Sequence, residues 1–154
     1  MQSMMVRLKL TVNTAKTRTC RVPEETFDFL GYTLGRCYSA KTGRSYIGTR
    51  PSKQRIRRMC EAISEATRRR TMRADAEDLV ADLNRMLIGW ANYFCLGPVS
   101  KAYRGVDAHA RGRLRQWLCG KHQVDGRGLR RFSDVYLHQT LGLTRLSVRV
   151  RNLP

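Results

Sequence analysis

The basic residues in the middle of the chain are the side chains best suited to bind another molecule. Lys53, Arg55, Arg57 and Arg58 stand near the start of a helical pattern, and Arg68–Arg70 stand near its end. Arginines three residues apart lie on neighbouring turns of a helix, so they can straddle a phosphate backbone. A solvated basic face is the alternative interpretation. However, 30 Lys and Arg face only 12 Asp and Glu, and this imbalance favours contact with nucleic acid.

Basic residues also recur in the second half of the chain, and the formal net charge is +18 with a pI near 10.8. This excess indicates a polyanionic partner, with nucleic acid first and an anionic membrane surface second. Because the charges lie on several expected elements, they favour a broad surface for a folded RNA, or for an RNA–DNA hybrid, over one helix in a DNA groove. The residues predicted to bind RNA are Lys53, Arg55, Arg57, Arg58, Arg68, Arg69, Arg70, Arg104, Arg111 and Arg115.

A run of aromatic and small residues, Gly89–Phe94, lies on a second expected helix. Trp90 and Phe94 fit the apolar stripe of that helix, which favours core packing over stacking on bases. Tyr93 lies off the stripe and is the better candidate for base stacking. Gly89 costs about 1 kcal/mol relative to alanine inside a helix, so we expect the close approach of another helix at this position.

Cysteine and histidine residues are the candidates for a metal site. Cys119 and His122 supply two ligands at a suitable spacing, but no second pair in the sequence matches a zinc template. His109 and His138 are predicted to be structural or surface residues. The sequence contains no recognisable nucleophile–base constellation and no phosphate-binding glycine loop. We therefore expect no catalytic residue, no metal ion and no cofactor.

Cysteine usage and hydropathy indicate a compartment. The five cysteines are odd in number and form no Cys-x-x-Cys pair, which argues against a disulfide framework and for a reducing environment. No apolar run reaches the roughly 20 residues of a membrane span, and the N-terminus lacks the apolar core of a signal peptide. No stretch has the purely apolar side of a lipid-facing helix. We expect a cytoplasmic protein without a membrane partner.

A small β-rich unit is expected in the first 50 residues. Residues 4–13 alternate between apolar and polar side chains, which is the period of a strand. A further extended piece is expected at Arg18–Val22, and Phe27–Leu34 is an apolar and aromatic stretch that Gly31 breaks. A hairpin is expected within Arg36–Arg50, with its tip at Ala40–Arg44.

Helices are expected after Pro51, with Ser52 as a good N-cap. Apolar residues then recur at helical spacing as far as a breaker zone at Arg70–Asp75, where acidic residues suit the N-terminus of a second helix. Gly97-Pro98 ends that second helix, and Ser100 is expected to cap a third.

These elements predict an α+β fold that is mainly α. A small β-rich N-terminal unit is followed by a three-helix bundle and a C-terminal extension. The expected domains are residues 1–50, 51–120 and 121–154. The last of these is basic and contains one short structured segment at Leu129–Leu146.

Three blocks of the sequence, in this order, are similar to one known family. The first two lie in the β-rich unit, and the third covers the first two expected helices. The matching residues are Leu8, Lys9, Leu10, Asn13, Lys16 and Thr17; Phe27–Tyr32; and Pro51–Arg70 with Leu83–Phe94, including Gly89, Trp90, Asn92, Tyr93 and Phe94. Together with Tyr136-Leu137 and Leu141–Leu143, they resemble the C-terminal part of a group II intron-encoded reverse transcriptase/maturase.

The resemblance implies the end of a palm in the first 50 residues and a maturase domain, also called thumb or X, in the helices. Its primer-grip-like residues are Phe29, Leu30, Gly31 and Tyr32. It further implies that the protein binds group II intron RNA and stabilises its splicing-competent form, while the RNA carries out the chemistry. The family's palm aspartates, including a Tyr-x-Asp-Asp motif, precede the first block and are absent from this sequence. We therefore expect no polymerase activity.

Two alternative functions stay open. The chain could be a fragment of a split reverse transcriptase that needs a separate fingers–palm chain. It could instead be a non-functional mobile-element remnant that binds RNA only through its charge. A homodimer could form through an unpaired strand edge in the β-rich unit, or through an exposed thumb face that in the resembled family meets the fingers–palm.

Overall fold

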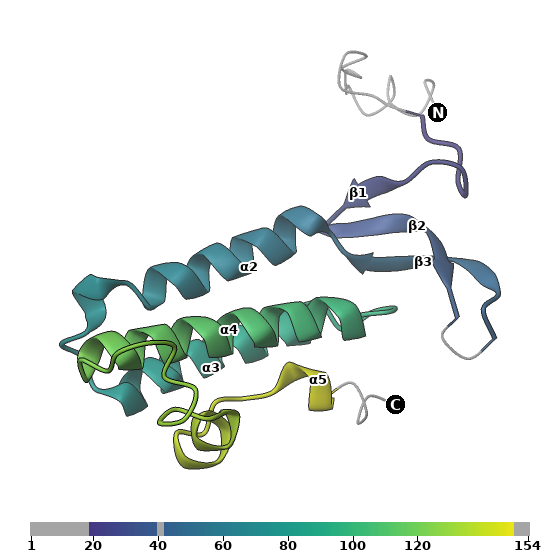
Figure 1. The fold of residues 1–154 in the computed structure, drawn as a ribbon. Helices are drawn as coiled ribbons and strands as arrows, with labels where there is room; N and C mark the ends of the chain where they lie inside the picture. Colours follow the sequence, from purple (N-terminus) through teal and green to yellow (C-terminus); the bar gives the residue numbers. More distant parts are fainter. Residues whose placement is uncertain (1–18, 40–41, 150–154) are drawn as a thin grey trace, which may run out of the picture.

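The computed structural model describes residues 19–39 and 42–149, and it has the mainly α, α+β fold that the sequence predicts. A three-stranded sheet leads into a bundle of three long helices, and the C-terminal segment lies along the bundle (Figure 1). The strand expected at residues 4–13 lies outside the described residues. The same holds for Asn13, Lys16 and Thr17.

The sheet is antiparallel, with the order β1-β2-β3. Its strands are β1 (Phe27–Phe29), β2 (Tyr32–Tyr38) and β3 (Ser45–Pro51). Leu30 and Gly31 both have positive φ, +50° and +86°, which is the geometry of the tight turn that joins twisted strands. The break expected at Gly31 within Phe27–Leu34 is therefore the turn between two paired strands. The hairpin expected within residues 36–50 is confirmed by the pairing of β2 with β3.

The extended piece expected at Arg18–Val22 is wrong over its described part. Residues 19–21 have no regular structure, and a turn begins at Val22. Pro23 follows in this turn and has no N–H to donate to a ladder. Strand pairing consequently begins only at Phe27.

The first helix of the bundle is α2 (Lys53–Ala66). The Ser52 hydroxyl accepts the backbone N–H of Arg55 at 3.3 Å, so the predicted N-cap is confirmed. The helix ends at Ala66, four residues before the expected breaker zone, and a short 3-10 turn, η2 (Arg69–Thr71), follows it. Arg68, Arg69 and Arg70 thus lie beyond the helix, whereas the sequence predicted them at its end.

The other two long helices are α3 (Ala76–Tyr93) and α4 (Ser100–Lys121). Their apolar stripes meet α2 in one core, as predicted. The core residues of these helices with no more than 2% exposure are Val80, Leu83, Leu87, Tyr103, Val106, Ala110, Leu114, Trp117 and Leu118. Hydrophobic burial of this kind is the main favourable term in folding.

The predicted cap of α4 is wrong. Val99 is the N-cap, and it makes no side-chain capping hydrogen bond. Val99 is buried in the core, so packing decides where this helix begins. The preceding Gly97 has a φ of +76°, and a Cβ atom there would lie 1.9 Å from the carbonyl oxygen of Thr49 in β3. A glycine at this position therefore lets the α3–α4 turn approach the sheet.

The C-terminal segment packs into the same core. It contains a π-helical turn, η3 (Tyr136–Thr140), and a short helix, α5 (Leu146–Arg149). Leu137 and Leu146 are fully buried. The Asp107 carboxylate of α4 accepts the backbone N–H groups of Leu146 at 3.0 Å and Ser147 at 2.9 Å. The C-terminal segment and the bundle therefore share one core, and the predicted domain division stays a prediction.

Candidate nucleic-acid interface

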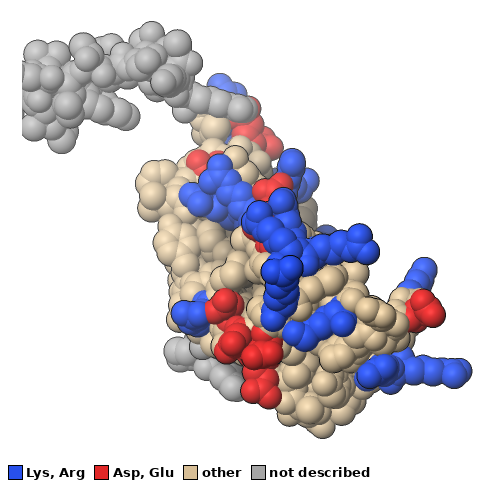
Figure 2. Space-filling view, turned by 90° about the vertical axis from the view of Figure 1, so that its left-hand side faces the viewer, with Lys and Arg blue, Asp and Glu red and all other residues tan. Residues whose placement is uncertain are grey.

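The connection between α2 and α3 displays four exposed arginines at one end of the bundle. They are Arg68, Arg69, Arg70 and Arg73. Figure 2 looks onto this end of the molecule and shows Lys and Arg side chains gathered over its middle, with acidic side chains beside them. Glu77 and Asp78 lie in the first turn of α3 at this same end, where they complement the helix dipole. We call residues 67–75 the arginine turn.

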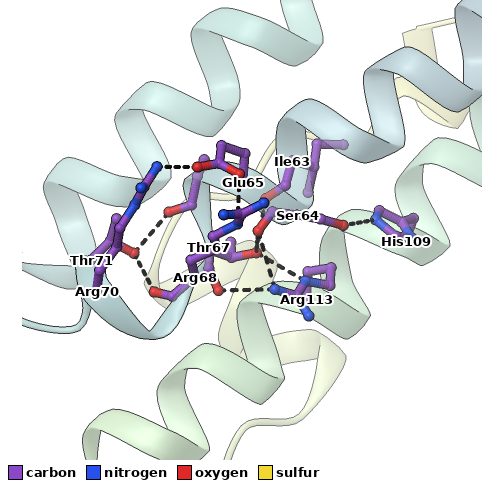
Figure 3. A network of polar contacts seen from close by, with 10 residues as sticks. Ile63, Ser64, Glu65, Thr67, Arg68, Arg70, Thr71, His109 and Arg113 are labelled. Atoms are coloured by element: carbon purple, nitrogen blue, oxygen red, sulfur yellow. Dashed lines mark hydrogen bonds and ion pairs between the residues drawn. The ribbon is translucent and has the colours of Figure 1, made fainter.

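The backbone of the arginine turn is held by Arg113 of α4. Its guanidinium donates to the carbonyl oxygens of Ser64 at 3.2 Å and Thr67 at 3.1 Å, and to the Thr67 hydroxyl at 3.1 Å (Figure 3). The last carbonyls of a helix have no partner within the helix. A cation that donates to them also interacts favourably with the helix dipole. Arg113 thereby fixes the point at which the chain leaves α2.

Thr71 and Lys121 hold the rest of the turn. The Thr71 hydroxyl donates to the carbonyl oxygens of Ala66 at 2.9 Å and Arg68 at 2.7 Å, and it accepts from the buried Trp117 indole at 3.1 Å. The Lys121 ammonium donates to the carbonyl oxygen of Met72 at 3.2 Å. These bonds fix the backbone between α2 and α3, so the arginines project from a preorganised support.

One carboxylate faces the arginines of the turn. Glu65 forms ion pairs with Arg68, at 2.5 Å from its Nε, and with Arg70 (Figure 3). Both pairs are exposed, and exposed ion pairs contribute between zero and about 1 kcal/mol. Arg69 and Arg73 have no acidic partner within residues 19–39 and 42–149. A phosphate could therefore bind Arg69 and Arg73 directly and compete with Glu65 for the others.

The start of α2 carries the other predicted cluster, in which Lys53, Arg55, Arg57 and Arg58 are all exposed. Arg57 pairs with Glu61 at 2.8 Å on the outer face of the helix. A Cβ atom on Gly31 would lie 2.9 Å from the Nε of Arg55, so this side chain lies over the β1–β2 turn. The cluster is separated from the arginine turn by the length of α2.

Arg111 and Arg115 were predicted to bind RNA, but in the structure both side chains contact other residues of the fold. Both form ion pairs with Asp134, and Arg115 also donates to the carbonyl oxygen of Phe132 at 2.8 Å. Burial raises the pKa of Asp134, but the Arg115 hydrogen bond and the charges of Arg111 and Arg115 outweigh it and hold that pKa below its usual value. Because the Arg115 side chain is only 13% exposed, its first role is structural. Arg104 is exposed.

The primer-grip-like residues and the aromatic run meet at the junction of sheet and bundle. The Tyr32 hydroxyl donates to the Tyr93 carbonyl oxygen at 2.5 Å, and the Tyr93 hydroxyl donates to the Leu30 carbonyl oxygen at 2.9 Å. Burial raises the pKa of Tyr32. The Tyr32 ring is buried, whereas Phe29 and Leu30 are 61% and 65% exposed.

The predictions for the aromatic run are largely confirmed. Phe94 is buried, and Trp90 packs between Phe94 and Tyr103 with ring centroids 5.1 and 5.8 Å apart. Tyr93 is 55% exposed, as its off-stripe position predicts, and Asn92 is also exposed. Base stacking by Tyr93 stays a prediction.

The explanation offered for Gly89 is wrong. A Cβ atom on Gly89 would have no other heavy atom within 4 Å, and the residue is exposed. No close helix approach within the described chain requires a glycine there. Its neighbours Met86 and Trp90 are partly buried against the core.

The histidines and cysteines make contacts within the fold. His109 lies 2.9 Å from both the Ser64 hydroxyl and the Cys60 carbonyl oxygen. Cys119 is buried in the core, whereas His122 is exposed beside Phe132. Across the described residues, no three side chains of His, Cys, Asp or Glu gather as metal ligands would. In that same part of the chain, every helix is too short or too polar to span a lipid bilayer.

Sequence reasoning missed the residues that support the interface. Arg113 contacts Thr67 and Ser64 from 46 and 49 residues away, and no local pattern signals a contact at that separation. Arg73 was within reach of the sequence, because it is a further arginine in the expected breaker zone. The sequence alone did not show that it would be exposed in the same connection as Arg68–Arg70.

Comparison with known families gives one match. The family model described as "Group II intron, maturase-specific domain" matches residues 56–133, which is half of the 154-residue chain. The match begins within α2 and includes the arginine turn, α3 and α4. It excludes the three-stranded sheet. No curated protein matches the chain.

Proposed function

The chain belongs to the group II intron maturase family, and from this premise we propose that it binds folded group II intron RNA and assists splicing. A maturase stabilises the splicing-competent fold of an RNA by binding that fold more tightly than the unfolded one. The protein therefore needs positive charge that is already in place before the RNA arrives. The catalytic groups of splicing are those of the RNA in this proposal.

The arginine turn is the observation that carries the proposal. Arg68, Arg69, Arg70 and Arg73 share one exposed turn, and Arg113 and Lys121 fix its backbone from α4. Charge of this kind binds phosphates at low ordering cost, because the supporting hydrogen bonds are made in the free protein. The cluster at the start of α2 supplies a second group of cations. Two separate groups suit a folded RNA better than a single strand.

The proposal assigns no enzymatic step to the chain. The matched domain is the maturase-specific domain rather than a polymerase palm, which supports a role as an RNA-binding protein. DNA or an RNA–DNA hybrid would bind the same arginines through phosphates, so these are secondary candidate partners. We place the activity in the cytoplasm, in keeping with the free cysteines of the described residues.

The test is binding to a group II intron RNA and to an unrelated structured RNA of equal length, each across a salt series. Tighter binding to the intron, persisting as salt is raised, is expected. Equal affinities that fall together with salt would contradict the proposal, because charge alone would then account for binding. That second outcome is the behaviour of a mobile-element remnant.

A second candidate function is favoured by the apolar surface beside β1. Phe29, Leu30, Tyr93 and Leu96 are all more than half exposed, and β1 pairs only with β2 among the described strands. Exposed apolar groups beside an open strand edge are typical of surfaces that meet another chain. A separate fingers–palm polypeptide of a reverse transcriptase would fit this surface. Primer extension by the chain with and without such a polypeptide separates this function from the first.

A further inference from the structure

A cavity of about 330 Å³ lies between α4 and the C-terminal segment, apart from the arginine turn. Three arginines line it: Arg104 and Arg111 from α4, and Arg145 from the loop before α5. Arg104 and Arg113 are nine residues apart on one helix, so these two residues are separated by about 14 Å along α4. Arg111 and Arg113 are two residues apart and therefore do not share a face of the helix.

The carboxylates at this cavity are already engaged. Asp107 accepts two backbone N–H groups at the start of α5, and Asp134 is paired with Arg111 and Arg115. Neither carboxylate binds the other two arginines of the cavity. Arg104 and Arg145 are exposed and form no ion pair with any described residue. Positive charge therefore remains in excess at this cavity.

His138 adds a polar atom that lacks a partner. Its Nδ1 lies 2.6 Å from the carbonyl oxygen of Leu143. A carbonyl oxygen can only accept, so Nδ1 carries a proton and donates. The other nitrogen, Nε2, is buried and has no hydrogen-bond partner among the described residues. An orphaned polar atom of this kind is costly, and the imidazole that carries it lies on the wall of the cavity.

We propose that this cavity binds a phosphate group of the RNA backbone, held by Arg104 and Arg145, with the His138 imidazole on the cavity wall. Guanidinium groups match the oxygens of a phosphate with paired N–H donors, and donors from separate elements suit a tetrahedral anion. The source of the phosphate rests on the proposed function, whereas free inorganic phosphate offers the same chemistry. The cavity would be a second anchor for the RNA that also contacts the arginine turn.

Two measurements on the intact chain test this site. The first is a titration with inorganic phosphate, followed by NMR of the His138 imidazole. The second is the salt dependence of intron RNA binding. The variants are Arg104→Gln, Arg145→Gln and the two combined. The matched control is Arg127→Gln with Arg130→Gln, which removes equal charge from exposed residues elsewhere in the C-terminal segment.

Phosphate should shift the His138 signal saturably in the wild type and in the control, and should not do so in the combined cavity variant. The salt slope for RNA should fall by about 0.7–0.9 in the combined variant, the value for one lost phosphate contact. Each single variant should lose most of that amount, because both arginines hold the same phosphate.

The outcomes separate this site from the proposed function. RNA binding by the wild type with no response of His138 to phosphate, or equal RNA losses in the cavity variant and the control, would overturn the site. A saturable His138 response in a protein that binds no RNA would support the cavity as a phosphate site. That result would overturn the maturase function and the RNA backbone as the source of the phosphate.

Discussion

The arginine turn and residues 111–115 of α4 are both rich in arginine, yet their arginines have different roles. In the turn, Arg69 and Arg73 project into solvent. In α4, Arg113 binds backbone carbonyls and Arg115 is mostly buried against Asp134. These arginines of α4 therefore stabilise the fold, and Arg113 supports the backbone from which Arg69 and Arg73 project. Net charge predicts a polyanionic partner, but only the fold shows which cations are free to bind it.

The largest effect is expected from Arg113→Met, which removes the link between the two regions. The carbonyl oxygens of Ser64 and Thr67 would lose a charged donor, so the free energy of unfolding should fall by about 1–3 kcal/mol. RNA affinity should also fall, although Arg113 is not among the displayed arginines. Urea denaturation and RNA titration below the unfolding transition measure the two effects.

Arg69→Met is the control for this prediction, since it changes the same residue type where no described contact is lost. Its unfolding free energy should stay within about 0.5 kcal/mol of the wild type. Equal urea midpoints for the Arg113 and Arg69 variants would contradict the prediction that Arg113 stabilises the fold and Arg69 does not.

The next effect concerns the displayed arginines alone. Arg69→Gln combined with Arg73→Gln should leave stability unchanged and reduce the slope of log affinity against log salt by about 1.4–1.8. This corresponds to two phosphate contacts at about 0.7–0.9 each. The same double change at Arg127 and Arg130 serves as the charge-matched control. An unchanged salt slope in the Arg69/Arg73 variant would mean that these two arginines make no phosphate contacts.

These two regions also show how far the sequence could predict the molecule. The core of α3 and α4 could be predicted, because residues such as Leu83 and Leu114 follow a local period of 3.6. The Ser52 cap could be predicted for the same reason, since its partner lies three residues away. Of the candidate site, the sequence could predict the cluster of arginines at residues 68–70.

The errors share a different cause. The end of α2 depends on Arg113, which is 46 residues from Thr67. The start of α4 depends on the burial of Val99 and on the approach of Gly97 to Thr49. Long-range packing overrides local signals at such positions, as it routinely overrides helix propensity. The roles of Arg111 and Arg115 escaped prediction likewise, because Asp134 reaches them only in the folded chain.

A smaller effect is expected from Glu65→Gln, which should raise RNA affinity. Glu65 occupies Arg68 and Arg70 in the free protein, and a phosphate must compete with it. An exposed pair is worth at most about 1 kcal/mol, so affinity should rise by a few-fold and stability should hardly change. Glu61→Gln, which frees only Arg57 on α2, is the matched comparison. A loss of affinity in the Glu65 variant would mean that this carboxylate positions the arginines for RNA instead of competing with it.

The smallest effect concerns the ion pairs of Asp134 with Arg111 and Arg115, whose contribution to stability depends on pH. The pKa of Asp134 is lower in the folded protein than its usual value, so its ion pairs stabilise the fold above about pH 4 and this contribution is lost as pH falls further. Asp134→Asn should therefore cost up to about 1 kcal/mol near pH 7, because the carboxylate is partly exposed. The cost should vanish in acid. A cost that is independent of pH would assign Asp134 a packing role, and Arg111 and Arg115 would then be held mainly by other contacts, such as the Phe132 carbonyl oxygen.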